Sequence, residues 1–291
     1  MSTQITTAMV KTYSSTVNFL ASQETARLPQ FFSVESIHAE EAFFEQVGTV
    51  EMRDVTSRHT DTEYTDTPHA RRRVTPVTSQ IADLIDRADR VRVNIAPDGA
   101  YTRRHAEAWG RRLDDHIINA AFGTAYTGKD GSTSTSFDSN NVIAVNLGGG
   151  GNVGLTLAKV AEANRILDAA EVPREDRVAV IGAKQIADLM AISQATSGDY
   201  VQLRPLMDGL VTSWMGFTFI QSQRLLQVAG EDYRRCIFAH RDGIKIGMAE
   251  DMFASVDVIP TKKFATQVYL EGVAGATRME EARVVEVICD E

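Results

Sequence analysis

The strongest candidate for chemistry is a glycine-rich segment, Gly149–Gly154, which reads Gly-Gly-Gly-Asn-Val-Gly. Its spacing matches G-x-G-x-x-G, and it lies between an expected strand at 142–147 and an expected helix at 155–170. Backbone amides at the start of such a helix would face a dinucleotide phosphate. The next expected strand ends in Gly182–Ala183 rather than in the acidic residue that binds a ribose. A flexible turn is therefore the preferred interpretation, and a nucleotide-binding oxidoreductase is kept as an alternative.

Imidazole and carboxylate groups also gather in the polar stretch 59–69, and both are metal ligands. No apolar residues flank this stretch to hold such ligands in place, and the neighbouring Arg71–Arg73 would repel a cation. We expect no metal here, but a solvated hairpin tip that makes ion pairs to a neighbouring subunit. The candidate intersubunit contacts are His59, Asp61, Asp66, His69, Arg71, Arg72 and Arg73.

Signatures of a catalytic nucleophile are missing, since the sequence contains neither G-x-S-x-G nor H-E-x-x-H. Cys236 and His240 are four residues apart, but they lie in an expected strand, where this spacing separates them by about 13 Å. Cys236 and Cys289 are the only cysteines, and we expect both to be buried as small hydrophobic residues. The sequence thus predicts no catalytic residue, no cofactor and no enzyme.

The composition excludes further classes of function. The formal net charge is −9, whereas a protein that mainly neutralises phosphates needs a basic balance. No run of 18 apolar residues could span a membrane, and the first ten residues do not look like a secretory signal. A reader of nucleic-acid sequence and a membrane protein are both disfavoured.

The segment from Gly48 to Thr78 is unusually polar, with threonine, aspartate, arginine and histidine in place of large apolar residues. Valines near its two ends, together with Met52, suggest two β arms around a polar tip at Thr62–Pro68. A two-stranded ribbon of this kind is marginal in water. We therefore expect it to lie on another copy of the chain.

Hydrophobic periodicity predicts a long helix over 101–122, with its apolar positions three or four residues apart and an arginine-rich and aspartate-rich opposite face. A short amphipathic helix is expected near 80–85, and an exposed mobile loop over 124–141. A further helix is expected over 183–192, and strands are expected at 91–95, 177–181, 214–219, 235–240, 243–249, 263–271 and 283–289.

The order of these parts resembles the major capsid proteins of tailed bacteriophages with the HK97-like fold. The residues that carry the resemblance are HTDTEYTDTPHARRR (59–73), RRLDDHIINAAFGTAYTG (111–128), VAVIGAKQIADLM (178–190) and the closing segment 243–291. An encapsulin-like compartment shell protein shares this fold and stays an alternative.

The resemblance implies an α+β fold with an N-terminal arm (1–42), an extended E-loop hairpin (43–80), a P-domain (81–173 and 251–291) and an inserted A-domain (174–250). The P-domain would hold the long spine helix and long β-strands. Such subunits form pentamers and hexamers of an icosahedral shell around double-stranded DNA, assembled in the host cytoplasm. The implied partners are the chain itself, a portal and the packaged DNA, which is bound without sequence specificity.

Two departures from parts of that family lead to further expectations. Some members crosslink a ribbon lysine to a neighbour, but this chain has no lysine between Lys11 and Lys129, so a non-covalent shell is expected. Only about 40 residues precede the ribbon, which is too short for a long scaffolding segment. A separate scaffolding protein, or none, is therefore expected, unless this chain is an already processed form.

Overall fold

The computed structural model describes residues 23, 25–55, 57–59, 61, 62, 64–86, 97–192 and 213–291, and gives only the backbone for 97–100. These residues form a mixed α+β fold with three β-sheets. The chain divides into two compact units, the first from 1–26, 78–112 and 250–273, and the second from 27–77, 113–249 and 274–291. Short 3-10 helices occur at Pro29–Phe31, Ser139–Asn141, Arg241–Gly243, Pro260–Lys262 and Glu281–Arg283.

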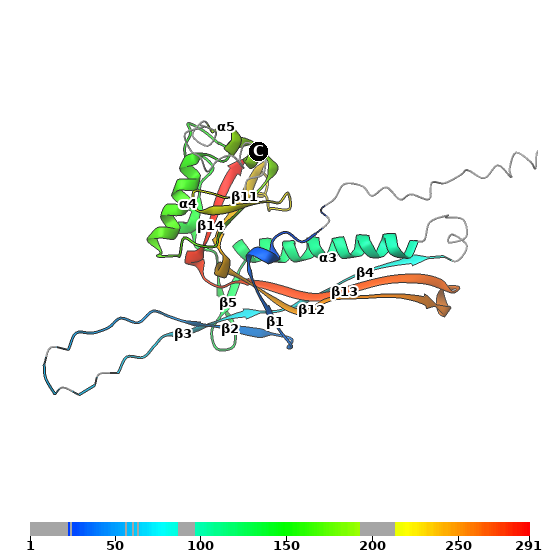
Figure 1. The fold of residues 1–291 in the computed structure, drawn as a ribbon, viewed down its shortest axis with the longest axis horizontal. Coiled ribbons are helices and arrows are strands. Elements are labelled where there is room, and N and C mark those ends of the chain that lie inside the picture. The colour runs from blue at the N-terminus through cyan, green and yellow to red at the C-terminus, as the bar shows by residue number, and fades with distance from the viewer. Residues whose placement is uncertain are drawn as a thin grey trace, which may run out of the picture. The chain divides into compact units, whose positions relative to one another are not determined.

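The first unit is a helix packed on long strands. The helix is the first part of α3 (Pro97–Phe122), and the strands are neighbours in the order β12 (Ile244–Ile259), β13 (Ala265–Arg278) and β4 (Val77–Ile85) (Figure 1). Trp109 Nε1 donates to Asp251 Oδ1 at 3.2 Å, and the indole lies directly over Gly272 of β13. A side chain at position 272 would overlap the indole, so this glycine allows the close approach of helix and sheet.

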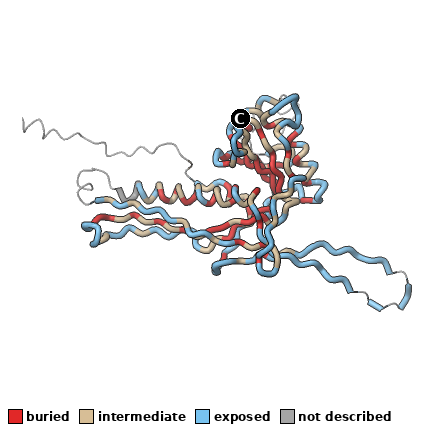
Figure 2. Tube along the Cα trace, turned by 180° about the vertical axis from the view of Figure 1, so that it is seen from behind, coloured by how far each residue is buried: buried red, intermediate tan, exposed pale blue. Residues whose placement is uncertain are grey.

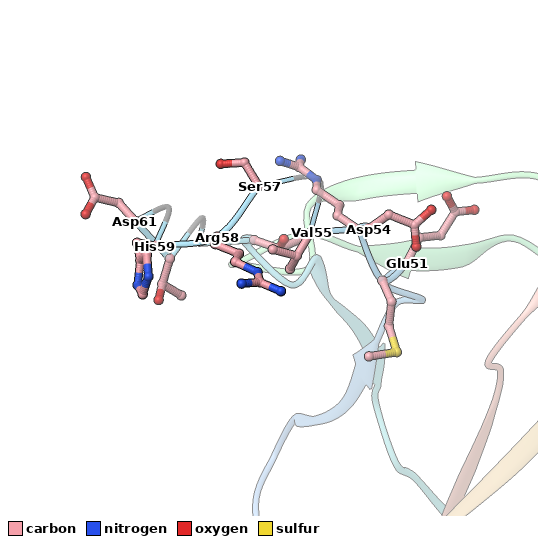
Figure 3. A pocket seen from close by; sticks show the side chains of 11 residues that line it. Glu51, Asp54, Val55, Ser57, Arg58, His59 and Asp61 are labelled. Atoms are coloured by element: carbon pink, nitrogen blue, oxygen red, sulfur yellow. The ribbon is translucent and has the colours of Figure 1, made fainter.

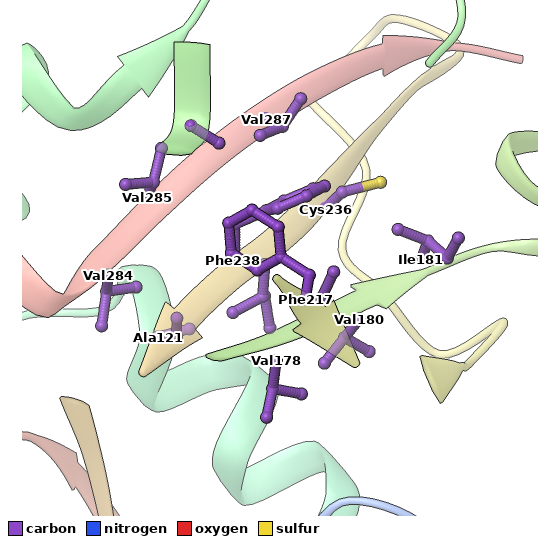
Figure 4. Packing of buried hydrophobic residues seen from close by; sticks show 14 of the residues in the cluster. Ala121, Val178, Val180, Ile181, Phe217, Cys236, Phe238, Val284, Val285 and Val287 are labelled. Carbon is purple, nitrogen blue, oxygen red and sulfur yellow. The ribbon is translucent and has the colours of Figure 1, made fainter. Parts of the chain in front are cut away.

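The main core lies in the second unit, in a six-stranded sheet. Strand β8 (Arg177–Ile181) is buried along its whole length. It is flanked by the antiparallel β11 (Tyr233–His240) and the parallel β10 (Phe217–Gln221). Apolar side chains from these strands and from β14 (Val284–Asp290) interdigitate around Phe217 and Phe238, whose rings meet edge to face at 5.0 Å (Figure 4). Helices α4 (Leu157–Ala169) and α5 (Ala183–Ala191) belong to the same unit. The strand order is β7 (Val142–Ile143), β14 (Val284–Asp290), β11 (Tyr233–His240), β8 (Arg177–Ile181), β10 (Phe217–Gln221) and β9 (Ser213–Trp214).

A smaller sheet in the second unit forms the base of the polar ribbon. Its strand order is β2 (Ala42–Val47), β3 (His69–Val74), β5 (Ala125–Thr127) and β6 (Thr133–Thr135). Ile37, Phe44 and Val74 make a small buried cluster of their own. The short strand β1 (Ser33–Ser36) instead joins β12, where it pairs in parallel with residues 245–248.

Several predicted elements are confirmed. The long helix is present and begins earlier than expected, at Pro97, because proline is tolerated in the first helical turn. The strand at 177–181 and the strands near 235–240 and 283–289 occur as β8, β11 and β14, and the helix near 183–192 occurs as α5. Strands β12 and β13 run longer than predicted, and the strand expected at 91–95 lies outside the described residues.

Three local predictions are wrong. Residues 80–85 form strand β4, which is hydrogen-bonded to β13 in the sheet, rather than a helix. Ser79 and Asp83, on one side of this strand, contact Arg112 and His105 of α3. The expected mobile loop 124–141 contains the hairpin β5–β6, which adds to β3. Asp114, expected on the solvated face of α3, is fully buried. Its carboxylate accepts hydrogen bonds from the backbone amides of Arg27 and Leu28.

The predicted ribbon is shorter in its paired part than expected. The antiparallel pairing of β2 and β3 joins residues 42–47 to 69–74, so the arms lie nearer the base than Val50 and Met52. Both of these residues are exposed and outside any strand. The described residues between Thr49 and Pro68 form no strand and are all exposed (Figure 2). The stretch that lacks support from its own chain is therefore 49–68, which we call the ribbon tip.

No helix in the described part of the chain is both long enough and apolar enough to cross a membrane.

Candidate intersubunit surfaces

The three arginines of β3 all make ion pairs with acids of their own chain. Arg71 Nη2 lies 2.9 Å from Glu45 Oε1, and Arg73 Nη1 lies 3.2 Å from Glu41 Oε1. Arg73 also stacks over the ring of Tyr126, with 4.7 Å between its guanidinium carbon and the ring centroid. Because successive side chains of a strand point to opposite faces of the sheet, Arg72 points away from the face that carries Arg71 and Arg73. The arginine triplet therefore serves two different faces of the small sheet.

Arg72 is the buried member of the triplet. Its side chain is 9% exposed, against 45% for Arg71. Its Nη2 donates to both carboxylate oxygens of Glu281, at 2.7 and 3.0 Å. Its Nε donates to the carbonyl of Met279 at 2.9 Å. Gln46 of β2 donates to the same carbonyl. This network ties both strands at the base of the ribbon to residues 279–281.

Arg278 connects Glu281 of this network to the end of α3. It is fully buried and donates to the carbonyls of Ala121 and Gly123, at the end of α3, at 3.0 and 2.7 Å. Burial lowers the pKa of this guanidinium, while Glu281 acts in the opposite direction. A cation at this point also suits the negative end of a helix dipole. Neither Arg278 nor Glu281 was singled out by the sequence, because nothing in the local pattern shows which charges are buried.

The ribbon tip presents polar and apolar side chains to solvent. Figure 3 shows the open hollow that it encloses, which is lined by charged residues such as Glu51, Asp54 and Arg58 together with polar and apolar ones. Met52 and Tyr64 are fully or nearly fully exposed, although both have large apolar surfaces. His59 has a positive φ of 63°, which is uncommon for a residue with a side chain.

The structure does not bring the predicted imidazole and carboxylate residues together. Among the described residues, which include His59, Asp61, Asp66 and His69, no three His, Cys, Asp or Glu side chains lie close enough to hold a metal ion. His69 and Arg71–Arg73 lie in β3, whereas the other three lie in the ribbon tip. Their role as intersubunit contacts stays a prediction.

The glycine-rich segment is held by its own chain in a way that does not suit a phosphate. Thr156 caps α4, and the amide of Leu155 donates to the Asp188 carboxylate at 3.0 Å. A side chain at position 154 would overlap that same carboxylate, which explains the glycine there. The fully buried Lys159 donates to the carbonyls of Val153, Gly154 and Ile288. A carboxylate at the helix start repels an anion, so the segment behaves as the structural turn that the sequence favoured.

The cysteines occupy the buried positions expected of them. Cys236 and Cys289 are free thiols on the neighbouring strands β11 and β14, with no exposed surface. The pKa of Cys236 is raised well above its usual value, mainly by a hydrogen bond with Cys289 and secondly by burial. A thiol with a raised pKa is a poor nucleophile. His240 lies at the other end of β11, as the prediction of a strand required.

Exposed apolar residues on β12 were not anticipated from the sequence. Met252, Phe253, Val256 and Val258 are each about half exposed or more, in a strand otherwise rich in acids. Phe264 follows at the turn into β13 and is also exposed. Both faces of the strand carry apolar groups, so no simple alternation marked it as half-buried. Together with the ribbon tip, this strand offers uncovered surface to a partner.

Solved structures of phage capsids share this arrangement. The capsid structure of the cyanophage P-SCSP1u superposes with a TM-score of 0.72 at 16% identity, over 100% of this chain and 96% of that chain. The cyanophage Pam1 capsid gives 0.73 at 14% identity, over 98% and 97% of the two chains. Mycobacterium phage Che8 gives 0.68 at 16% identity, over 95% and 96%. These likenesses show an α+β fold of the HK97-like capsid class.

The family follows from the sequence match. The model of the phage capsid protein family matches residues 5–291, and the chain belongs to this family. No curated protein matches the chain. It is a structural major capsid protein of the tailed-phage type and a component of the virion capsid. Neither the oxidoreductase nor the cellular compartment shell is favoured by these findings.

Proposed function

We propose that this chain assembles through pentamers and hexamers into an icosahedral shell that encloses double-stranded phage DNA. The observation that carries the proposal is the ribbon tip, in a chain that belongs to a capsid family over nearly its whole length. The described residues of the ribbon tip, 49–68, are all exposed and bury almost nothing on their own subunit. In a shell, each tip gains its burial on an adjacent copy.

The domain division of the proposal follows the family pattern. Residues 1–42 act as the N-terminal arm, 43–80 as the E-loop, and 174–250 as the A-domain inserted between the two parts of the P-domain. The network of Arg72, Glu281 and Met279 supports this division, because it fixes the base of the E-loop and leaves its tip free to contact a neighbour. The contacts of the tip are then His59, Asp61 and Asp66, with Arg71 at the base still partly exposed.

The shell is held together without covalent bonds between subunits. The ribbon contains no lysine, since none occurs between Lys11 and Lys129, so the tip supplies no amine for an isopeptide bond. A net charge of −9 suits an inner wall that does not hold its DNA tightly. Assembly takes place in the host cytoplasm with a portal and a separate scaffolding protein. No catalytic residue or cofactor takes part.

Electron microscopy of the purified chain, expressed with and without its candidate scaffolding protein, tests the proposal. We expect closed particles built from rings of five and six subunits, which separate into single chains on a denaturing gel. A chain with residues 51–66 replaced by a short glycine-serine turn is expected to fold but not to close into particles. Wild-type protein that stays monomeric under all these conditions, or a covalent ladder on the gel, would contradict the respective part of the proposal.

A further inference from the structure

His240 is the last residue of strand β11, and it caps the short 3-10 helix Arg241–Gly243 that follows. Its Nδ1 accepts a hydrogen bond from the backbone amide of Asp242 at 3.1 Å. A ring nitrogen that accepts a hydrogen bond carries no proton, so the neutral imidazole holds its proton on Nε2. The contact with the backbone therefore fixes the tautomer of His240.

This cap cannot survive protonation of the ring. A second proton can bind only to Nδ1, because Nε2 already carries one. Two N–H groups would then face each other across the 3.1 Å that separates Nδ1 from the amide of Asp242, and neither could accept. The imidazole is buried and has little room to turn away. The 3-10 helix must therefore move when His240 gains a proton.

The side chain of Asp242 connects the same helix to strand β1. Its Oδ1 accepts a hydrogen bond at 2.7 Å from Oγ of Ser33, the first residue of β1. Its Oδ2 lies 3.8 Å from Nδ1 of His240, and the side chain is 59% exposed, so the carboxylate has room to shift. A protonated imidazole repels the amide of Asp242 and attracts its carboxylate. Both forces move Asp242 away from the position in which it holds Ser33.

The charges around the ring keep His240 neutral at neutral pH. Burial is the largest influence and lowers the pKa of its imidazole. Asp242 and Asp176 act against this shift, whereas Arg283 and Arg177 add to it. Protonation of the folded chain therefore requires a pH below about 6.5, the usual value for a histidine. Above that pH the contacts from His240 to Ser33 stay intact.

Both arginines are engaged with other acids. Arg177 is fully buried and donates to Asp168 at 2.7 Å. Arg283 donates from Nε to Glu280 at 2.6 Å, and its Nη1 lies 3.8 Å from Oδ2 of Asp242. These partners hold the two guanidinium groups where they are. Asp242, with its exposed carboxylate, is thus the charged neighbour that responds when His240 gains a proton.

We propose that His240, Asp242 and Ser33 form an acid-sensitive latch on strand β1, in which a proton on Nδ1 displaces the 3-10 helix 241–243 and releases Ser33. The pairing of β1 with β12 and the ion pair between Lys245 and Glu35 remain, so β1 loosens without leaving the sheet. Because β1 precedes the ribbon strand β2 by only a few residues, its hold on that part of the chain becomes dependent on pH. The latch acts within one subunit and is independent of the proposed shell.

Amide hydrogen exchange of the full chain at about pH 7.5 and about pH 5, corrected for the intrinsic pH dependence of exchange, tests the proposal. We expect the protection of peptide 33–37 to fall at least about fivefold in acid. Peptide 160–167 of α4 should keep its protection, which distinguishes a local opening from unfolding. Equal protection of 33–37 at the two pH values would overturn the proposal.

Two histidine variants show which side chain is responsible. His240→Asn places an oxygen near the position of Nδ1 that accepts the same hydrogen bond but binds no proton, so we expect it to abolish the fall. His38→Asn is the matched control, because His38 is exposed and lies two residues beyond β1. It should behave as wild type. An equal fall in His240→Asn and wild type would overturn the assignment to His240.

A Ser33→Ala variant keeps the proposal testable even where His240→Asn does not fold. Loss of the hydroxyl removes the hold of Asp242 on β1 at every pH. At about pH 7.5 we therefore expect the protection of 33–37 to lie within about twofold of the wild-type value in acid, with little further fall. Wild-type protection at neutral pH followed by the full fall in acid would overturn the role of Ser33.

The tautomer of His240 is the structural basis of the latch and can be observed directly. Nitrogen NMR of a chain labelled at its histidines, compared with that of His240→Asn, identifies the signals of this ring. We expect the proton on Nε2 at about pH 7.5 and a protonated Nδ1 only below about pH 6.5. A proton on Nδ1 at neutral pH would contradict the cap and with it the proposal.

Discussion

The six-stranded sheet and the ribbon tip belong to the same unit of the chain but differ in how much of their surface that chain buries. Strand β8 is buried on both faces, and its neighbours supply Phe217 and Phe238. The ribbon tip has no strand and no buried residue among those described. The first region gains its stability from its own chain. The second has a fixed base and an uncovered tip, which is expected where the stabilising contacts come from another subunit.

This contrast separates folding from assembly. Substitutions in the sheet should lower the free energy of unfolding of the single chain, and substitutions in the tip should change only the association of chains. The base of the ribbon, with Arg72 and Arg278, lies between these two extremes, because it is buried but serves to hold the tip.

The largest effect is expected in the sheet. Phe238→Ala removes a fully buried ring that packs edge to face against Phe217 and Phe219, at 5.0 and 6.3 Å. We expect it to lower the free energy of unfolding by about 3–5 kcal/mol, measured by urea denaturation of the unassembled chain. Tyr64→Ala in the tip is the matched control and should change that free energy by less than about 0.5 kcal/mol. Similar losses for the two variants would remove the contrast.

A smaller effect is expected at the base of the ribbon. Arg72→Ala leaves Glu281 without its close partner and the carbonyl of Met279 without one donor. We expect a loss of about 1–3 kcal/mol in the free energy of unfolding. Arg71→Ala removes an exposed ion pair with Glu45 and should cost less than about 1 kcal/mol. Urea denaturation in low and high salt compares the two, and an equal cost would mean that Arg72 is not a buried anchor.

A weaker, pH-dependent effect is expected at His240. Burial lowers the pKa of its imidazole, Asp242 and Asp176 oppose this shift, and Arg283 and Arg177 add to it. The unfolded chain therefore binds a proton first as the pH falls below about 6.5. Stability is retained above that pH and is lost progressively as the pH falls toward the lowered pKa of the folded state. Thermal unfolding between pH 7.5 and 5 should show a smaller drop for His240→Asn than for wild type, and an equal drop would contradict this assignment.

The sequence predicted the elements whose hydrophobic period is regular. The helix with Trp109, Leu113 and Ile117 was evident, as were β8 and β14, because their apolar residues recur at the spacing of a helix or fill a buried strand. Strand β4 was mistaken for a helix, since Ile81, Leu84 and Ile85 fit a helical period and only the pairing of the segment with β13 shows the strand. Local pattern was outweighed there by tertiary packing.

The candidate surface was predictable in outline only. The polarity of residues 49–68 identified the ribbon tip in the sequence. The same reasoning wrongly continued the unsupported stretch to Thr78, because the local sequence does not show that β3 pairs with β2 and β5. The burial of Arg72, Asp114 and Arg278 could not be predicted, since the sequence does not show whether a charged residue has a hydrogen-bonding or ionic partner in the fold. The exposed apolar residues of β12 were not anticipated either, since they lie on both faces of the strand.

Limited proteolysis of the ribbon tip in single subunits and in assembled particles tests the central claim most directly. Arg53 and Arg58 offer trypsin two sites within the tip. We predict rapid cleavage there in dilute unassembled chains, and cleavage at least about a hundredfold slower in particles, with the six-stranded sheet intact in both. Equal resistance of the tip in the single chain and in the particle would show that its stability comes from its own subunit, and would contradict the account.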